Sequence, residues 1–289
     1  MTGQRAMERF YEQITFIFDR LHGFWEHEEL HRKISIGLVF FFLASLAAIE
    51  LNRRGLLPAQ AAQMIPRNHF HAVQAAFVVI LVLEVVSLIF VLPCSFSRSV
   101  GKQFEILALI LMRNAFKELA YFPEPITFAG NQEKVLHILA DGFGALIIFA
   151  LLGIYYMVQK RFAKKGRVPA ELFEFVAAKK AISMVLLAIF AAMGCWSLYV
   201  NAAGAGRADF FQDFYTVLIL TDILIVLVAQ CFNPSSSSIF RNSGYALSTM
   251  IIRLALVAPV YYNVLLGAAA VVFAIGLTLI SCRLFSEEP

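Results

Sequence analysis

Residues 72–93 read AVQAAFVVILVLEVVSLIFVLP, an apolar run whose one charged residue, Glu84, lies near its middle. A helix needs about 20 mostly apolar residues to cross a bilayer, and this run is long enough. Its apolar residues follow one another without alternation, which excludes a strand of a membrane barrel. The stretch therefore predicts a transmembrane helix that carries a carboxylate at mid-depth.

The composition extends this prediction to the whole chain. Of its 289 residues, 60% are hydrophobic and 15% are charged, whereas soluble domains average about 45–50% apolar and about 25% charged residues. Because a helix satisfies its own backbone in lipid, we expect an all-α polytopic membrane protein whose partner is the lipid bilayer. The net charge of +4 does not indicate a nucleic-acid partner. Eight transmembrane helices are predicted, at 33–51, 72–93, 103–121, 136–158, 180–200, 211–231, 244–259 and 261–282.

The eight segments fall into two sets of four that resemble each other in order. The run LVLEVVSLIFVLPCSF at 81–96 matches LILTDILIVLVAQCF at 218–232, with an acid and a cysteine in corresponding places. The run EILALILMR at 105–113 likewise matches ALSTMIIR at 246–253. Because each set has an even number of spans, the two repeats have the same orientation and are related by an axis along the membrane normal.

The chain therefore divides into four predicted parts, and the first of them has a helical pattern of its own. Apolar residues recur at helical spacing from Phe10 to Trp25, with charged residues between them, as in an amphipathic interfacial helix. Packing of this helix on the cytoplasmic ends of the bundle is an equally open alternative. The parts are the amphipathic helix at 1–30, a first repeat at 31–160, a basic cytoplasmic linker at 161–178 and a second repeat at 179–289.

Lys and Arg residues orient the predicted bundle in the membrane. They gather before the first span, after the second, and between the fourth and fifth. Positively charged loops stay in the cytoplasm, so we expect a protein of the cell inner membrane with both termini cytoplasmic.

Four charged residues lie within the apolar segments and form two acid–base sets. Ionised side chains near the bilayer centre are costly and are usually paired. We therefore predict that Glu84 pairs with Arg113 and that Asp222 pairs with Arg253. These pairs either fix helix register or line a substrate or ion path, and both interpretations are open. Lys117 belongs to the same candidate path, because Arg98, Lys102, Glu105, Leu109, Arg113 and Lys117 follow steps of three or four along one helix face.

A second group of polar residues lies toward the opposite, extracytoplasmic side of the first repeat. Imidazole and carboxylate groups are ligands for zinc and similar divalent ions. A metal site is one interpretation, and ordinary interfacial polar residues without a cofactor are the other, since no recognised metal motif is present. The candidate metal ligands are Glu50, His69, His71, Glu118, His137 and Asp141.

Three functions are compatible with these features. The leading hypothesis is an integral membrane transporter or channel for a small solute or ion, with the paired charges at the interface between the repeats. The alternative is a non-transporting membrane scaffold, sensor or complex subunit whose charge pairs are structural. The third is a membrane-embedded metal-dependent enzyme that uses the outer His and acid cluster, although the chain lacks the common hydrolase and nucleotide-binding motifs. A homo-oligomer or a membrane partner is compatible with each.

Overall fold

The computed structural model describes residues 2–58, 62, 65–162, 171–202, 210–232 and 234–284, and the regular structure within them is entirely helical. Each of the eight predicted transmembrane segments coincides with one long helix. The elements are α1 (Thr2–Trp25), α2 (Glu28–Arg53), α4 (Phe70–Val91), α5 (Phe96–Lys117), the short η1 (Glu118–Tyr121), α6 (Gln132–Phe162), α7 (Glu171–Ala202), α8 (Phe210–Phe232), α9 (Ser236–Val257) and α10 (Tyr262–Leu284).

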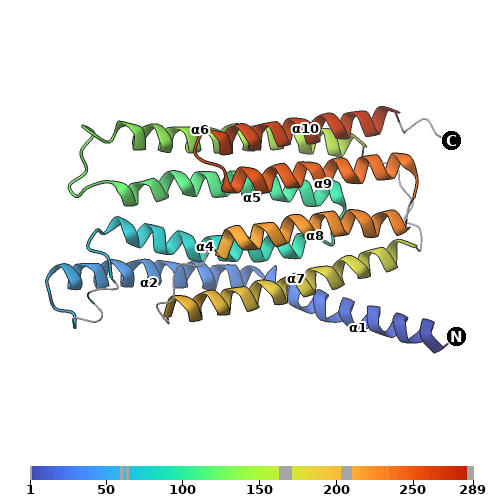
Figure 1. The fold of residues 1–289 in the computed structure, drawn as a ribbon, viewed down its shortest axis with the longest axis horizontal. Helices are drawn as coiled ribbons and strands as arrows, with labels where there is room; N and C mark the ends of the chain where they lie inside the picture. The colour runs from blue at the N-terminus through green and yellow to red at the C-terminus, as the bar shows by residue number, and fades with distance from the viewer. Residues whose placement is uncertain are drawn as a thin grey trace.

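The long helices run side by side along one axis and alternate in direction (Figure 1). Neighbours in sequence pack together within each predicted half: α2 on α4, α4 on α5 and α5 on α6, then α7 on α8, α8 on α9 and α9 on α10. The halves meet where α5 contacts α9 and α6 contacts α10. The start of α1 and the end of α10 lie at the same end of the bundle.

Six of the described helices are long and apolar enough to cross a membrane, namely α2, α4, α6, α7, α8 and α10. Helices α5 and α9 do not meet the same standard, because α5 carries five charged residues and α9 is rich in Ser, Thr and Arg. These two polar helices pack against each other and are flanked by α4, α6, α8 and α10. Of these two helices, α5 is the better covered, with buried residues along most of its length.

The largest apolar core joins both halves rather than filling each separately. It contains Phe104 of α5, Tyr155 of α6, Ile252 of α9 and Ala274 of α10. A second core joins α4, α7 and α8 around Phe214. Leu256 of α9 packs against both cores. A polar group placed near Leu256 is therefore surrounded by apolar side chains and remote from water.

Helix α1 packs against the bundle, which is the second of the two arrangements expected for it. The Phe18 side chain is buried, and Asp19 accepts a 2.6 Å hydrogen bond from Lys180 of α7. The Trp25 indole donates a 3.0 Å hydrogen bond to the Ser87 hydroxyl of α4. The predicted linker at 161–178 is wrong in its second part, since α7 begins at Glu171; residues 163–170 lie outside the described residues.

Candidate functional site

The first predicted charge pair is present and closed. The Arg113 guanidinium of α5 is in direct contact with Glu84 Oε1 of α4, and both side chains are 13% exposed. The other carboxylate oxygen, Glu84 Oε2, is buried without a hydrogen-bond partner. The pair ties α4 to α5 at a depth where water is scarce.

The second predicted pair is also present, but it is open. Arg253 Nη2 of α9 lies 3.8 Å from Asp222 Oδ2 of α8, which is beyond hydrogen-bond distance. Arg253 is 1% exposed, and its Nε, Nη1 and Nη2 atoms have no hydrogen-bond partner among the described residues. A buried donor without a partner costs about 1–3 kcal/mol, and more when it is charged. Arg253 thus offers donors that the described protein groups leave unused.

Tyr215 of α8 joins the two pairs and was not predicted from the sequence. Its side chain is buried, and it interacts electrostatically with both Arg253 and Arg113. The two arginines come from different halves, so the two charge pairs are neighbours at the bundle centre. One sequence signal was available: Tyr215 precedes Asp222 by two helical turns, which places both on one face of α8.

A small cavity adjoins the open pair at the interface between the halves. Its volume is about 20 Å³, and Ser99 and Gln103 of α5 line it opposite Asp222 and Thr249. Gln103 Oε1 is buried without a partner, while its amide nitrogen donates a 3.4 Å hydrogen bond to the Ser99 hydroxyl. The Thr249 hydroxyl of α9 interacts with the Asp222 carboxylate. Four polar residues thus line the cavity, and its other lining residues, Leu92, Phe96, Val100, Ile225 and Ala246, are apolar.

The predicted polar face of α5 lies mostly toward the surface of the bundle. Arg98 and Leu109 are exposed, and Lys102 pairs with Glu105 at 3.0 Å on a half-exposed surface. The buried polar face instead contains Ser99, Gln103 and Arg113, which also follow steps of three and four through Ile106 and Ile110. On α5 the inward face carries uncharged polar residues. Charged residues can lie on the outer face, because their long side chains reach the polar headgroups from there. Lys117 is exposed at the end of α5.

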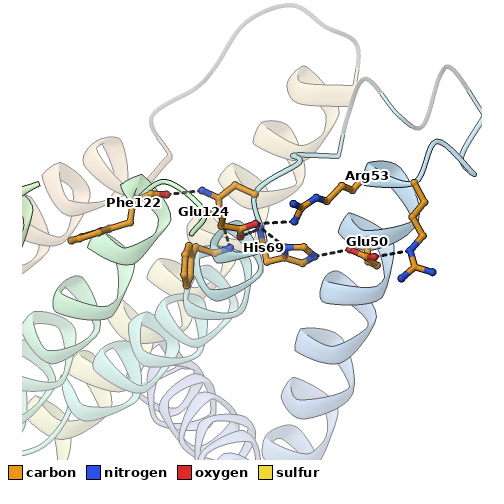
Figure 2. A network of polar contacts seen from close by, with 8 residues as sticks. Glu50, Arg53, His69, Phe122 and Glu124 are labelled. Atoms are coloured by element: carbon orange, nitrogen blue, oxygen red, sulfur yellow. Dashed lines mark hydrogen bonds and ion pairs between the residues drawn. The ribbon is translucent and has the colours of Figure 1, made fainter. Parts of the chain in front are cut away.

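At the end of the bundle where α2 ends and α4 begins, His69 lies between two carboxylates, as Figure 2 shows. Its Nε2 atom is 3.2 Å from Glu50 Oε2 of α2, and its Nδ1 atom is 3.1 Å from Glu124 Oε2. The His69 backbone N–H donates a 2.7 Å hydrogen bond to Glu124 Oε1. The hydrogen bonds from His69 lower the pKa of the Glu124 carboxyl. Arg53 and Arg54 complete the network through Glu124 and Glu50.

The other predicted metal ligands lie apart from this network. His137 Nδ1 is 3.8 Å from Glu118 Oε2. The buried Asp141 carboxylate accepts a 2.8 Å hydrogen bond from Asn263 of α10, and His71 Nδ1 is buried without a partner. Within the described ranges, no group of three or more His, Cys, Asp or Glu residues is arranged to hold a metal ion. In the described part of the chain, Glu50 and His69 thus belong to one network, and His137 pairs with Glu118.

Six apolar helices and charges buried between them define the chain as a helical membrane protein. Comparison of the chain with models of protein families, with curated proteins and with solved structures finds no match.

Proposed function

We propose that the protein is an integral membrane transporter or channel for a small solute or ion. The path passes between two same-orientation four-helix repeats, 31–160 and 179–289, and each repeat contributes one acid–base pair. All eight long helices cross the membrane in this proposal, with the polar α5 and α9 on either side of the path. Substrate sites between repeats near mid-depth are common in transporters built this way.

The observation that carries the proposal is the open Asp222–Arg253 pair. A buried ion pair that served packing alone would gain stability by closing, because each unsatisfied charged donor is costly. Arg253 instead lies 3.8 Å from its partner with its nitrogens unused, and the partner, Asp222, lines a small cavity. The closed Glu84–Arg113 pair fits the structural role. In this proposal Glu84–Arg113 has a structural role, and transport takes place at Asp222–Arg253.

The chemistry of the open pair supports a charged or polar cargo. The planar guanidinium of Arg253 can hold an anionic group by two hydrogen bonds, and the Asp222 carboxyl can exchange protons. Lys117, exposed at the far end of α5, would attract an anion toward that mouth of the path. From the positions of the basic loops we infer that both termini lie in the cytoplasm and that the protein belongs to the inner membrane.

The test is flux in proteoliposomes made with the purified protein. A panel of monovalent ions and small uncharged solutes is offered under an imposed gradient, with protein-free vesicles as the baseline. We expect protein-dependent flux of at least one class, lost in Asp222→Asn and in Arg253→Gln. Flux that survives Glu84→Gln and Asp222→Asn together would contradict the role of these charges.

A second candidate, a membrane scaffold, sensor or complex subunit, is favoured by one feature of α2. Only 6% of its apolar window is buried inside the structure, the lowest share among the six apolar helices. Large side chains such as Val39, Phe40 and Leu43 are exposed along it. A stoichiometric partner that copurifies and is lost when these three are changed to Ala, in a protein without flux, would support this candidate.

A further inference from the structure

Two residues that line the same cavity each carry a buried oxygen atom without a hydrogen-bond partner. The atoms are Asp222 Oδ2 on α8 and Gln103 Oε1 on α5. Asp222 is 7% exposed and Gln103 is 2% exposed, so bulk water does not solvate either group. Both atoms accept hydrogen bonds, which means that neither can satisfy the other. The cavity between them requires a ligand that donates.

The size of the cavity selects that ligand. A volume of about 20 Å³ exceeds the roughly 10–15 Å³ that one water occupies by this measure. A water molecule donates two hydrogens, one for each orphan acceptor, and the Ser99 and Thr249 hydroxyls line the same space. This gives the water four polar neighbours, at the upper end of the usual range for buried waters.

We propose that this cavity holds one water that bridges Asp222 and Gln103 and relays protons to Asp222, an inference that rests on the proposed function. The relay opens toward the end of the bundle where α5 begins, because Ser99 lies in the first turn of that helix. The loop charges assign that end to the cytoplasm. The coupling ion of the transporter is then the proton.

The surroundings of Asp222 make it the carboxyl that exchanges protons, in contrast to Glu84. Arg253 of α9 is the charged residue that it faces, and no hydrogen bond from that guanidinium holds the carboxylate in its ionised form. Helix α5 presents the uncharged Ser99 and Gln103. Ile89 of α4 and Leu186 of α7 belong to the apolar core that also contains Ile225, three residues after Asp222 on α8.

The relay step balances in atoms and charge. A proton that reaches the cavity as hydronium passes to Asp222 Oδ2, forming a neutral carboxylic acid and leaving a neutral water. The reverse transfer restores the carboxylate and the hydronium. While Asp222 is protonated, the Arg253 charge is unbalanced and attracts an anionic group, which links proton uptake to binding of the cargo.

Infrared difference spectroscopy on the full-length protein in nanodiscs tests the relay without measuring flux, with the proton as the probe. Spectra at acid and alkaline pH report a buried carboxylic acid by its carbonyl stretching band. We expect one such band that disappears in Asp222→Asn and remains in the matched control Glu84→Gln. In Gln103→Leu, which keeps every charge, the rate of hydrogen–deuterium exchange at this carboxyl falls by about tenfold, the effect of losing one hydrogen bond.

Two results would overturn the proposal: a band lost in Glu84→Gln instead of Asp222→Asn, or an exchange rate that Gln103→Leu leaves unchanged. Gln103→Leu keeps the test decisive if Asp222→Asn fails to fold. If the protein shows flux but Asp222 does not titrate, the relay is excluded and the proposed function remains. If Asp222 titrates but the protein shows no flux, the proposed function is excluded and the titration of Asp222 remains.

Discussion

The two intramembrane charge pairs differ in how well each arginine is satisfied. Arg113 is in direct contact with Glu84, whereas Arg253 lies 3.8 Å from Asp222 and its guanidinium nitrogens have no described partner. An ion pair without hydrogen bonds loses the charge-assisted part of its stability. Two pairs with the same residue classes therefore have different energetic roles.

Double-mutant cycles should show this difference directly. Residues in contact have coupling energies of about 0.5–3 kcal/mol, and we expect Glu84–Arg113 near the upper end and Asp222–Arg253 near the lower. The variants are Glu84→Gln with Arg113→Gln, and Asp222→Asn with Arg253→Gln, singly and together. Unfolding in mixed micelles by added SDS gives the free energies. A larger coupling for Asp222–Arg253 would contradict the distinction between a closed and an open pair.

The pairings themselves could be predicted from sequence, because a charge within an apolar run has few ways to avoid lipid. Tyr215 and Gln103 could not be assigned in the same way. Both are polar residues whose helices could turn several faces inward. Packing of α8 against α9 brings Tyr215 to Arg253, and packing across the halves brings Gln103 to the cavity that Asp222 lines. The sequence shows which residues need partners, while helix rotation decides which partners they have.

At the scale of whole elements, α6 and α10 approach closely through a pair of glycines. A Cβ built on Gly144 of α6 would overlap the Val264 side chain of α10, and one on Gly267 of α10 would lie 2.7 Å from Ile148 Cδ1 of α6. Small residues allow membrane helices to pack backbone to backbone. This contact joins the last helices of the two halves.

We therefore expect Gly144→Ala to destabilise the protein by about 1–3 kcal/mol, the usual cost of overpacking. Gly153→Ala on the same helix is the matched control, since no atom lies within 4 Å of its added Cβ. The control should be neutral or gain up to about 1 kcal/mol from helix propensity. The same SDS titration measures both, and Val264→Ala should rescue Gly144→Ala. Equal effects of the two alanines would exclude the close contact.

The loop after η1 is a second element held by specific contacts, in this case to His69. Glu124 accepts hydrogen bonds from the His69 backbone and ring and ties the loop to the start of α4. These bonds favour the ionised carboxyl, which is why the pKa of Glu124 is lowered. The stabilisation is therefore complete above the ordinary carboxyl pKa and is lost as pH falls through the lowered value.

Hydrogen exchange at the His69 amide should follow this titration. Its protection, relative to a free peptide amide at the same pH, should drop as the solution becomes acidic. Glu124→Gln should give lower protection that no longer changes with pH in this range. Glu50→Gln keeps the Glu124 hydrogen bond and should retain the acid-sensitive drop. If Glu50→Gln abolished the acid-sensitive drop in protection and Glu124→Gln did not, the titrating carboxylate would be Glu50, which contradicts the prediction.

For the molecule as a whole, the positions of all eight long helices could be predicted, but their exposure to lipid could not. The apolar runs predict where helices lie because lipid requires internal backbone hydrogen bonds. Helices α5 and α9 depart from the apolar pattern since the other helices cover much of their surface. The outer His and acid residues were expected together, yet packing sends Asp141 to Asn263 and His69 to Glu124.

The number of crossings decides whether the two halves have the same orientation. If α5 crosses the membrane, Ser95 before it and Thr127 after it face opposite sides. If α5 stays on one side, as its low apolar content would allow, both face the same side. The two residues are exposed, and Ser95 makes no side-chain capping hydrogen bond, so cysteine can replace either with little disturbance.

Labelling of intact cells with a membrane-impermeant maleimide distinguishes the two arrangements. The background replaces Cys94, Cys195, Cys231 and Cys282 by Ser, and each variant carries one new cysteine. We expect Thr127→Cys to react in intact cells and Ser95→Cys to react only after permeabilisation, because the basic loops predict a cytoplasmic position for the Ser95 end. Reaction of both from the same side would leave α5 uncrossed. The two halves would then no longer both have an even number of spans. A two-fold axis along the membrane normal could then not relate the two charge pairs across one path.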